Sequence, residues 1–93
     1  MSERDLAAIF VAAGNAHHAA FAASNGEDAQ WPAWYAQWLA PRLRAQLASV
    51  PAAAVLADEL QQLDREYRSA AQTLQWPEYY ARWFIRKYGA LPG

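Results

Sequence analysis

The 93-residue chain contains no cysteine, which excludes a disulfide framework, a thiolate metal site and a cysteine nucleophile. It also lacks an excess of charge of either sign, since eight basic and nine acidic side chains give a formal net charge of −1. Proteins that bind DNA or RNA normally carry a concentrated basic face, so we expect no nucleic-acid partner. No apolar run has the length of a bilayer span or the form of a signal peptide, and we expect a cytoplasmic protein with no membrane partner.

Signatures of catalysis are missing as well. The sequence shows no phosphate-binding loop, no paired carboxylates and no activated nucleophile, so we expect no catalytic residue and no cofactor. His17 and His18, with Glu27 and Asp28 nearby in sequence, resemble a set of metal ligands. Adjacent residues of a helix point about 100° apart, however, so the two histidines do not converge on one ion and we expect no metal site.

Tryptophan and tyrosine, with five residues each, are abundant for so short a chain. They are concentrated in two similar segments: residues 30–39 read QWPAWYAQWL, and residues 75–84 read QWPEYYARWF. The two segments share Gln, Trp, Pro, Tyr, Ala and a second Trp at a spacing of 45 residues. We interpret them as an internal repeat.

The rest of the pattern predicts four helices. They are expected from Ser2 or Asp5 to about Ser24, from Pro32 to about Ala48, from about Pro51 to Gln72 or Leu74, and from Pro77 to about Tyr88. A turn at 24–28 ends the first helix, with Asn25 or Gly26 in the left-handed conformation. Pro41 predicts a kink or a restart within the second helix, and Gly89 closes the fourth. The tail from Ala90 to Gly93 is expected to fray.

Each of these segments carries an apolar stripe at helical spacing. In the third helix the predicted stripe is Val55, Leu56, Leu60, Leu63, Tyr67 and Leu74, and the predicted solvated side is Asp58, Glu59, Asp64, Arg65, Glu66 and Arg68. The five tryptophans are expected to supply core volume that the many alanines cannot.

One fold follows from the repeat and the stripes. Each half, about 5–48 and about 51–89, is predicted to be an αα-hairpin made of a long helix, a turn and a helix that starts at Trp-Pro. A single hairpin cannot bury its own apolar face, so the two are expected to pack together. We predict one all-α domain over 1–93, with four helices, pseudo-two-fold symmetry and an aromatic core.

The halves disagree at a few positions, where we look for function. Aligned at a spacing of 46, Gly14 stands opposite Leu60, His17 opposite Leu63 and His18 opposite Asp64. Losing two leucines from one stripe removes core volume beside a polar ring. We therefore predict that any ligand pocket lies at the following five residues: Gly14, His17, Trp34, Tyr35 and Trp38.

The alternative interpretation gives these residues a purely structural role. The aromatics then form core, and His17 is a buried, hydrogen-bonded side chain. A sharper alternative makes His17 a general base helped by Tyr35 or Asp28.

The first 40 residues also carry a resemblance. The segment from Ala16 through Phe21, then 25–28, then Trp31-Pro32-Ala33-Trp34-Tyr35-Ala36, resembles small, uncharacterised bacterial all-α proteins with a W-P-x-W-Y-A motif. The resemblance implies a compact helical domain and no catalytic residue. A bacterial source also fits the excess of arginine over lysine.

Two functions remain open. The leading expectation is a non-catalytic module that acts by association, either as a homodimer or by docking a helix of a protein partner, because the chain is small and rich in large aromatics. The alternative is a protein that binds a small molecule, or a minor enzyme, at the pocket named above.

Overall fold

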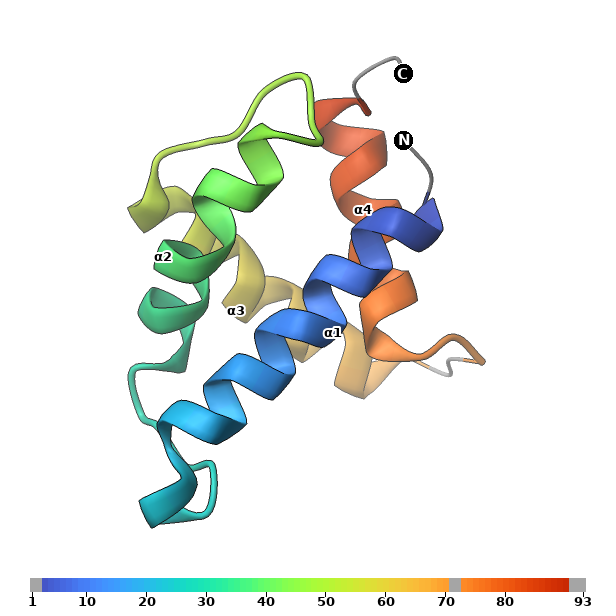
Figure 1. Cartoon of the computed structure of the whole chain (residues 1–93). Coiled ribbons are helices and arrows are strands. Elements are labelled where there is room, and N and C mark those ends of the chain that lie inside the picture. The colour runs from blue at the N-terminus through green and yellow to red at the C-terminus, as the bar shows by residue number, and fades with distance from the viewer. Residues whose placement is uncertain (1–2, 71–72, 91–93) are drawn as a thin grey trace.

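Four α-helices make up most of the chain: α1 (Glu3–Ala20), α2 (Trp31–Arg44), α3 (Ala53–Ser69) and α4 (Trp76–Tyr88), with a short 3-10 helix η1 (Ala22–Ser24) after α1 (Figure 1). This computed structural model describes residues 3–70 and 73–90. Over those residues the only extended pairing is a single antiparallel bridge between Leu47 and Ala90. The predicted all-α, four-helix fold is confirmed.

Both Trp-Pro segments begin a helix, as expected. α2 starts at Trp31 and α4 at Trp76, each with its proline in the first turn, where a missing N–H removes no helical hydrogen bond. The turn after α1 is also where the sequence predicts it, because Asn25 has φ 58° and Gly26 has φ 82°. Gly89, with φ 77°, ends α4.

Several predicted boundaries differ from the structure. α2 runs through Pro41 without a restart. Pro41 and Gln37 are both exposed, so the carbonyl that loses its N–H partner can bind water instead. α2 ends at Arg44, α3 spans only Ala53–Ser69, and the predicted start at Ser2 and the tail 91–93 lie outside the described residues.

The most extensive packing joins the two halves of the chain. α1 packs chiefly on α4 and α2 chiefly on α3, whereas α3 and α4, which are consecutive in sequence, touch only slightly. The N–H of Ala48 also donates to the carbonyl of Gly89 at 2.7 Å, which ties the end of the first half to the end of the second. Each half thus buries its apolar surface mainly against the other half.

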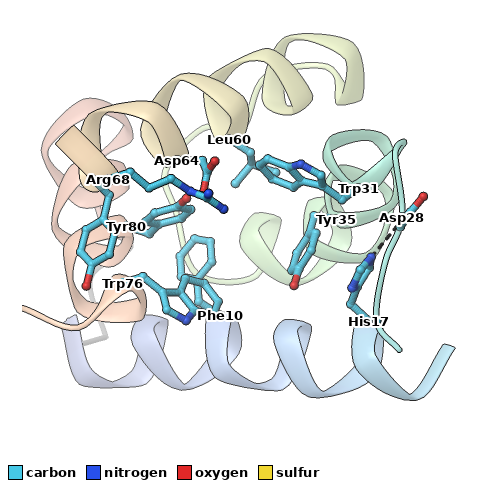
Figure 2. A pocket seen from close by; sticks show the side chains of 12 residues that line it. Phe10, His17, Asp28, Trp31, Tyr35, Leu60, Asp64, Arg68, Trp76 and Tyr80 are labelled. Atoms are coloured by element: carbon cyan, nitrogen blue, oxygen red, sulfur yellow. Dashed lines mark hydrogen bonds and ion pairs between the residues drawn. The ribbon is translucent and has the colours of Figure 1, made fainter. Parts of the chain in front are cut away.

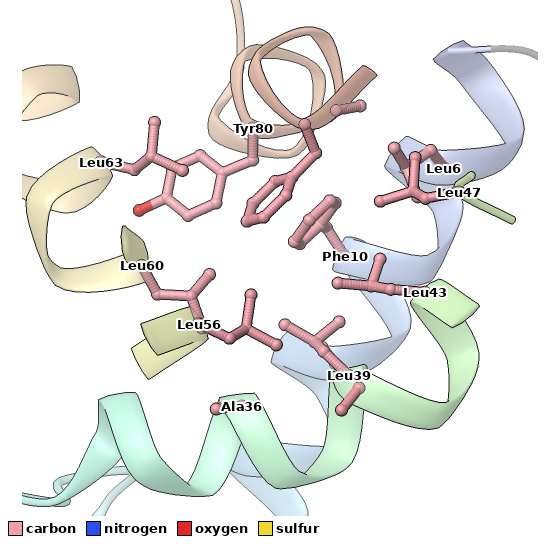
Figure 3. Close-up of a cluster of buried hydrophobic side chains, with 14 of the residues drawn as sticks. Leu6, Phe10, Ala36, Leu39, Leu43, Leu47, Leu56, Leu60, Leu63 and Tyr80 are labelled. Atoms are coloured by element: carbon pink, nitrogen blue, oxygen red, sulfur yellow. The ribbon is translucent and has the colours of Figure 1, made fainter. Parts of the chain in front are cut away.

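Leucine and phenylalanine, rather than tryptophan, fill the centre (Figure 3). The largest fully buried side chains are Phe10, Phe84, Leu6, Leu39, Leu43, Leu56, Leu60 and Leu63. The tryptophans that pack against this centre (Trp31, Trp38, Trp76 and Trp83) are only partly buried. The expected aromatic cluster is present, but its indole rings surround the core and do not occupy it.

Two residues of α3 differ in burial from the prediction: Val55 was expected in the core and Glu59 in solvent. Val55 is 48% exposed, because it lies about 100° around the helix from Leu56, at the margin of the stripe that faces the core. Glu59 is buried, because its carboxylate accepts a hydrogen bond from the Tyr88 hydroxyl at 2.6 Å and pairs with Lys87 Nζ at 2.5 Å. These contacts fasten α3 to α4 where the two helices otherwise touch little.

Candidate functional site

A cavity of about 490 Å³ lies between the two halves (Figure 2). Residues from α1, α2, α3 and α4 and from the loop between η1 and α2 line it. Six lining residues are aromatic: Phe10, Trp31, Tyr35, Tyr67, Trp76 and Tyr80. Two are small or aliphatic, Gly26 and Leu60, and four are charged or imidazole side chains: His17, Asp28, Asp64 and Arg68. The wall is therefore mainly aromatic, with a small number of polar groups.

His17 stands at one end of the cavity inside a set of rings. Its imidazole stacks on Tyr35 at 4.9 Å between ring centroids, lies 4.8 Å from Phe21 and meets the Trp34 ring edge-on at 5.0 Å. Its Nε2 lies 3.2 Å from Oδ2 of Asp28, and each of these two side chains is 9% exposed. The contact with Asp28 at Nε2 fixes the orientation of the ring.

The loop after α1 explains why Asp28 reaches His17. The left-handed residues Asn25 and Gly26 reverse the chain, and the Gly26 N–H donates to the carbonyl of Phe21 at 2.8 Å. Asp28 Oδ1 then accepts from the Gln30 N–H at 2.9 Å, in an Asx turn that leads into α2. One aspartate thus shapes the approach to the Trp-Pro helix and holds the histidine.

A second polar pair stands at the other end of the cavity, on α3. Arg68 Nε donates to Asp64 Oδ1 at 3.0 Å, one helical turn away. Burial and the nearby Asp64 carboxylate together raise the pKa of the Tyr80 hydroxyl well above its ordinary value. The sequence placed Asp64 and Arg68 on a solvated face. Arg68 is indeed 77% exposed, and the structure adds that this edge of α3 borders the cavity.

The space expected beside Gly14 is occupied. A Cβ on Gly14 would lie 3.3 Å from Cζ2 of Trp76 and 3.9 Å from the hydroxyl oxygen of Tyr35. Gly14 therefore allows the Trp76 indole from α4 to approach the backbone of α1 closely. Trp76 and Tyr35 form the cavity wall at this point, and Gly14 lies behind them.

The other predicted pocket residues are divided between two places. His17 and Tyr35 line the cavity, and Trp34 supports His17 from behind without lining it. Trp38 lies elsewhere, in a shallow groove between α1 and α2, where the Arg42 guanidinium sits 3.6 Å from the centre of its ring. The structure thus brings part of the predicted set together and separates Trp38 from it.

The sequence held a signal for three lining residues that our prediction missed: Trp31, Trp76 and Tyr80. Trp31 and Tyr35 of the first Trp-Pro segment and Trp76 and Tyr80 of the second stand at equivalent positions, 45 residues apart, and all four line the cavity. Our prediction looked for function where the halves differ. The shared Trp and Tyr positions face each other across the junction of the halves.

No group of three or more His, Cys, Asp or Glu side chains that could hold a metal ion occurs among residues 3–70 and 73–90. Within the same residues no helix combines the length and the hydropathy needed to cross a bilayer. Comparison with known protein families, with curated proteins and with solved structures finds no match to this chain.

Proposed function

We propose that this protein binds a small molecule with a flat, largely apolar body in the cavity between its two halves. The observation that carries the proposal is the cavity itself, about 490 Å³ in volume and lined by the equivalent Trp and Tyr of both Trp-Pro segments. A hollow of this volume is in the range of small-molecule sites. Aromatic faces and edges suit the stacking of a flat ring.

The polar groups support binding with a defined orientation. A ligand site typically combines an apolar lining with a few fixed polar groups, and this cavity has the His17–Asp28 pair at one end and the Asp64–Arg68 pair at the other. The Nε2 of His17 is engaged by Asp28 and its ring is stacked among aromatic side chains, and no serine, cysteine or lysine lines the cavity among the described residues. We therefore propose binding without turnover.

A duplication is part of the proposal. We propose that the two halves are copies of one hairpin in a bacterial, cytoplasmic protein. Helix α1 then corresponds to α3 and α2 to α4, so the α1–α4 contact corresponds to the α3–α2 contact. Those are the two most extensive helix pairs. A cavity at the junction then receives the same Trp and Tyr from each copy, whereas His17 comes from one copy only.

Binding is tested by isothermal titration with flat aromatic probes, comparing Trp76→Phe with Trp83→Phe. Both tryptophans are partly buried on α4, but only Trp76 lines the cavity. We expect Trp76→Phe to weaken binding severalfold and Trp83→Phe to leave it unchanged. If no probe binds, or if the two variants weaken binding equally, the proposal is wrong.

Self-association is a second proposal, supported by a different surface. Val11 on α1 is 47% exposed, and the groove beside it is lined by Ala8, Ile9, Ala12 and Trp38 among others. Small residues let another helix approach closely, and a second copy of this chain presents the same surface. A chain that remains monomeric in light scattering at high micromolar concentration contradicts this proposal. If it dimerises, Val11→Glu should return it to the monomer.

A further inference from the structure

The cavity contains an arginine whose donors are mostly unused. Figure 2 shows the Arg68 side chain running past Asp64 and Tyr80 toward the middle of the cavity. Its Nε donates to Asp64, and a guanidinium has five N–H donors, so four remain. The side chain is 77% exposed, which places its charge at the rim of the cavity, where a ligand would enter.

Two tyrosine hydroxyls add to this set of donors. Neither Tyr35 nor Tyr80 forms a side-chain hydrogen bond with another described residue, and no fully buried side-chain nitrogen or oxygen in that part of the chain lacks a partner. Both hydroxyls therefore face space that solvent can reach, and both residues line the cavity. Burial raises the pKa of Tyr35 and of Tyr80, so both hydroxyls keep their protons at neutral pH and can donate.

Most imidazole and carboxylate acceptors of the cavity, in contrast, already have partners among the described residues, with His17 Nδ1 and Asp64 Oδ2 as the exceptions. Oδ2 of Asp28 pairs with His17 and Oδ1 accepts from Gln30, while Asp64 is paired with Arg68. Aromatic faces alone would also attract a cation. A cationic ligand would, however, meet the guanidinium of Arg68 at the rim, and the charge of each carboxylate is already opposed or shared by a side chain of the cavity. The unused hydrogen-bonding capacity of the cavity therefore favours a ligand that accepts hydrogen bonds and carries negative charge.

Resting on the proposed binding function, we infer that the ligand is an aromatic carboxylate. Its ring lies between the Trp-Pro segments, among Trp31, Trp76 and the neighbouring tyrosines. Its carboxylate accepts hydrogen bonds from the remaining N–H groups of Arg68, whose planar fork matches the two oxygens of a carboxylate. Asp64 holds the guanidinium in place for this contact.

Three probes that share one ring system test the ligand class by isothermal titration at low salt: 2-naphthoate, 2-naphthamide and 2-naphthylmethylammonium. We expect the naphthoate to bind about tenfold more tightly than the amide, because the added contact is charge-assisted and lies at a solvated rim. The cation should bind most weakly. Added salt should reduce the preference for the naphthoate, since exposed charges are screened.

Two variants locate the contact. Arg68→Gln should remove the preference for naphthoate over naphthamide. Arg65→Gln, which changes an exposed arginine of the same helix that does not line the cavity, should leave the preference intact. Arg68→Lys should give an intermediate preference, because it retains the charge without the fork. Arg68 is exposed, so circular dichroism should show the same helix content in all three variants.

The outcomes separate the inference from the function on which it rests. If the amide or the cation binds as tightly as the naphthoate, the ligand class is wrong and the binding function stands. If the preference survives in Arg68→Gln, the contact assigned to Arg68 is overturned. If none of the three probes binds, the binding function is wrong and the ligand class falls with it.

Discussion

Replacing Gly14 by alanine places a methyl group directly against the wall of the cavity, and two opposing effects decide the result. A glycine inside a helix costs about 1 kcal/mol relative to alanine, so the helix itself gains from the change. The new Cβ would lie 3.3 Å from Cζ2 of Trp76, however, a few tenths of an ångström closer than the optimum of about 3.5–4.0 Å for two carbons.

The position of Trp76 decides which effect is larger. Its indole lines the cavity and is only partly buried, so it can move away from α1 by a few tenths of an ångström without displacing the core. We expect this shift to cost about 0.5 kcal/mol, half of the gain in helix propensity. Gly14→Ala should therefore raise the free energy of unfolding by about 0.5 kcal/mol and the melting temperature by about 2–4 °C.

Urea unfolding followed by circular dichroism measures the effect, because tryptophan fluorescence would itself respond to a change beside Trp76. Asn15→Ala, at the exposed neighbouring position of the same helix, is the matched control and should raise the free energy of unfolding by about 0.5 kcal/mol through propensity alone. A loss of more than about 1 kcal/mol in Gly14→Ala would refute the reasoning. It would show that Trp76 is held rigidly and that no open space lies beside it.

Three further predictions follow from the polar contacts. Glu59→Ala removes a buried carboxylate that accepts from the Tyr88 hydroxyl at 2.6 Å, and should lower the free energy of unfolding in urea by about 2–3 kcal/mol, whereas the exposed neighbour Asp58→Ala should change it by less than about 0.5 kcal/mol. His17→Leu leaves the buried Asp28 carboxylate without its side-chain partner and should lower the free energy of unfolding by about 1–2 kcal/mol in the same assay. A variant that is more stable than the wild type would contradict this prediction. Burial and the hydrogen bond to Glu59 raise the pKa of Tyr88 above its unfolded value near 10, so the hydroxyl stabilises the fold fully below pH 10 and progressively less as the pH rises above 10. Above pH 10 the melting temperature should therefore fall more steeply with pH in the wild type than in Tyr88→Phe. Equal slopes in the two proteins would contradict this.

The sequence predicts helices well where local chemistry decides the outcome. Trp31-Pro32 and Trp76-Pro77 start helices because proline fits the first turn. Asn25 and Gly26 take a positive φ as predicted, but Asn25 caps the 3-10 helix η1, and α1 itself ends earlier, at Ala20. The restart predicted at Pro41 does not occur, because the consequence of a proline inside a helix depends on whether water reaches the freed carbonyl. Solvent access at that point depends on tertiary packing, which the local pattern does not contain.

The site was harder to predict because it is formed by helices distant in sequence. Gly14 was expected to leave a gap because it stands where the second half has Leu60, but the packing of α1 on α4 puts the Trp76 ring into that space. Arg68 was correctly assigned to solvent from its position on the α3 wheel, but the wheel did not show that the edge of that face borders the cavity. Helical periodicity identifies the face of a residue, but only the helix crossings show what lies opposite it.

The central claim is that a small aromatic molecule binds at the junction of the two halves, and the indole N–H signals in the NMR spectrum test it most directly. Addition of 2-naphthoate should shift the signals of Trp31 and Trp76, which line the cavity, and leave those of Trp38 and Trp83, which do not. Assignment by single Trp→Phe variants identifies each signal. Shifts confined to Trp38 and Trp83, or no shift at any indole at a saturating concentration, would contradict the claim.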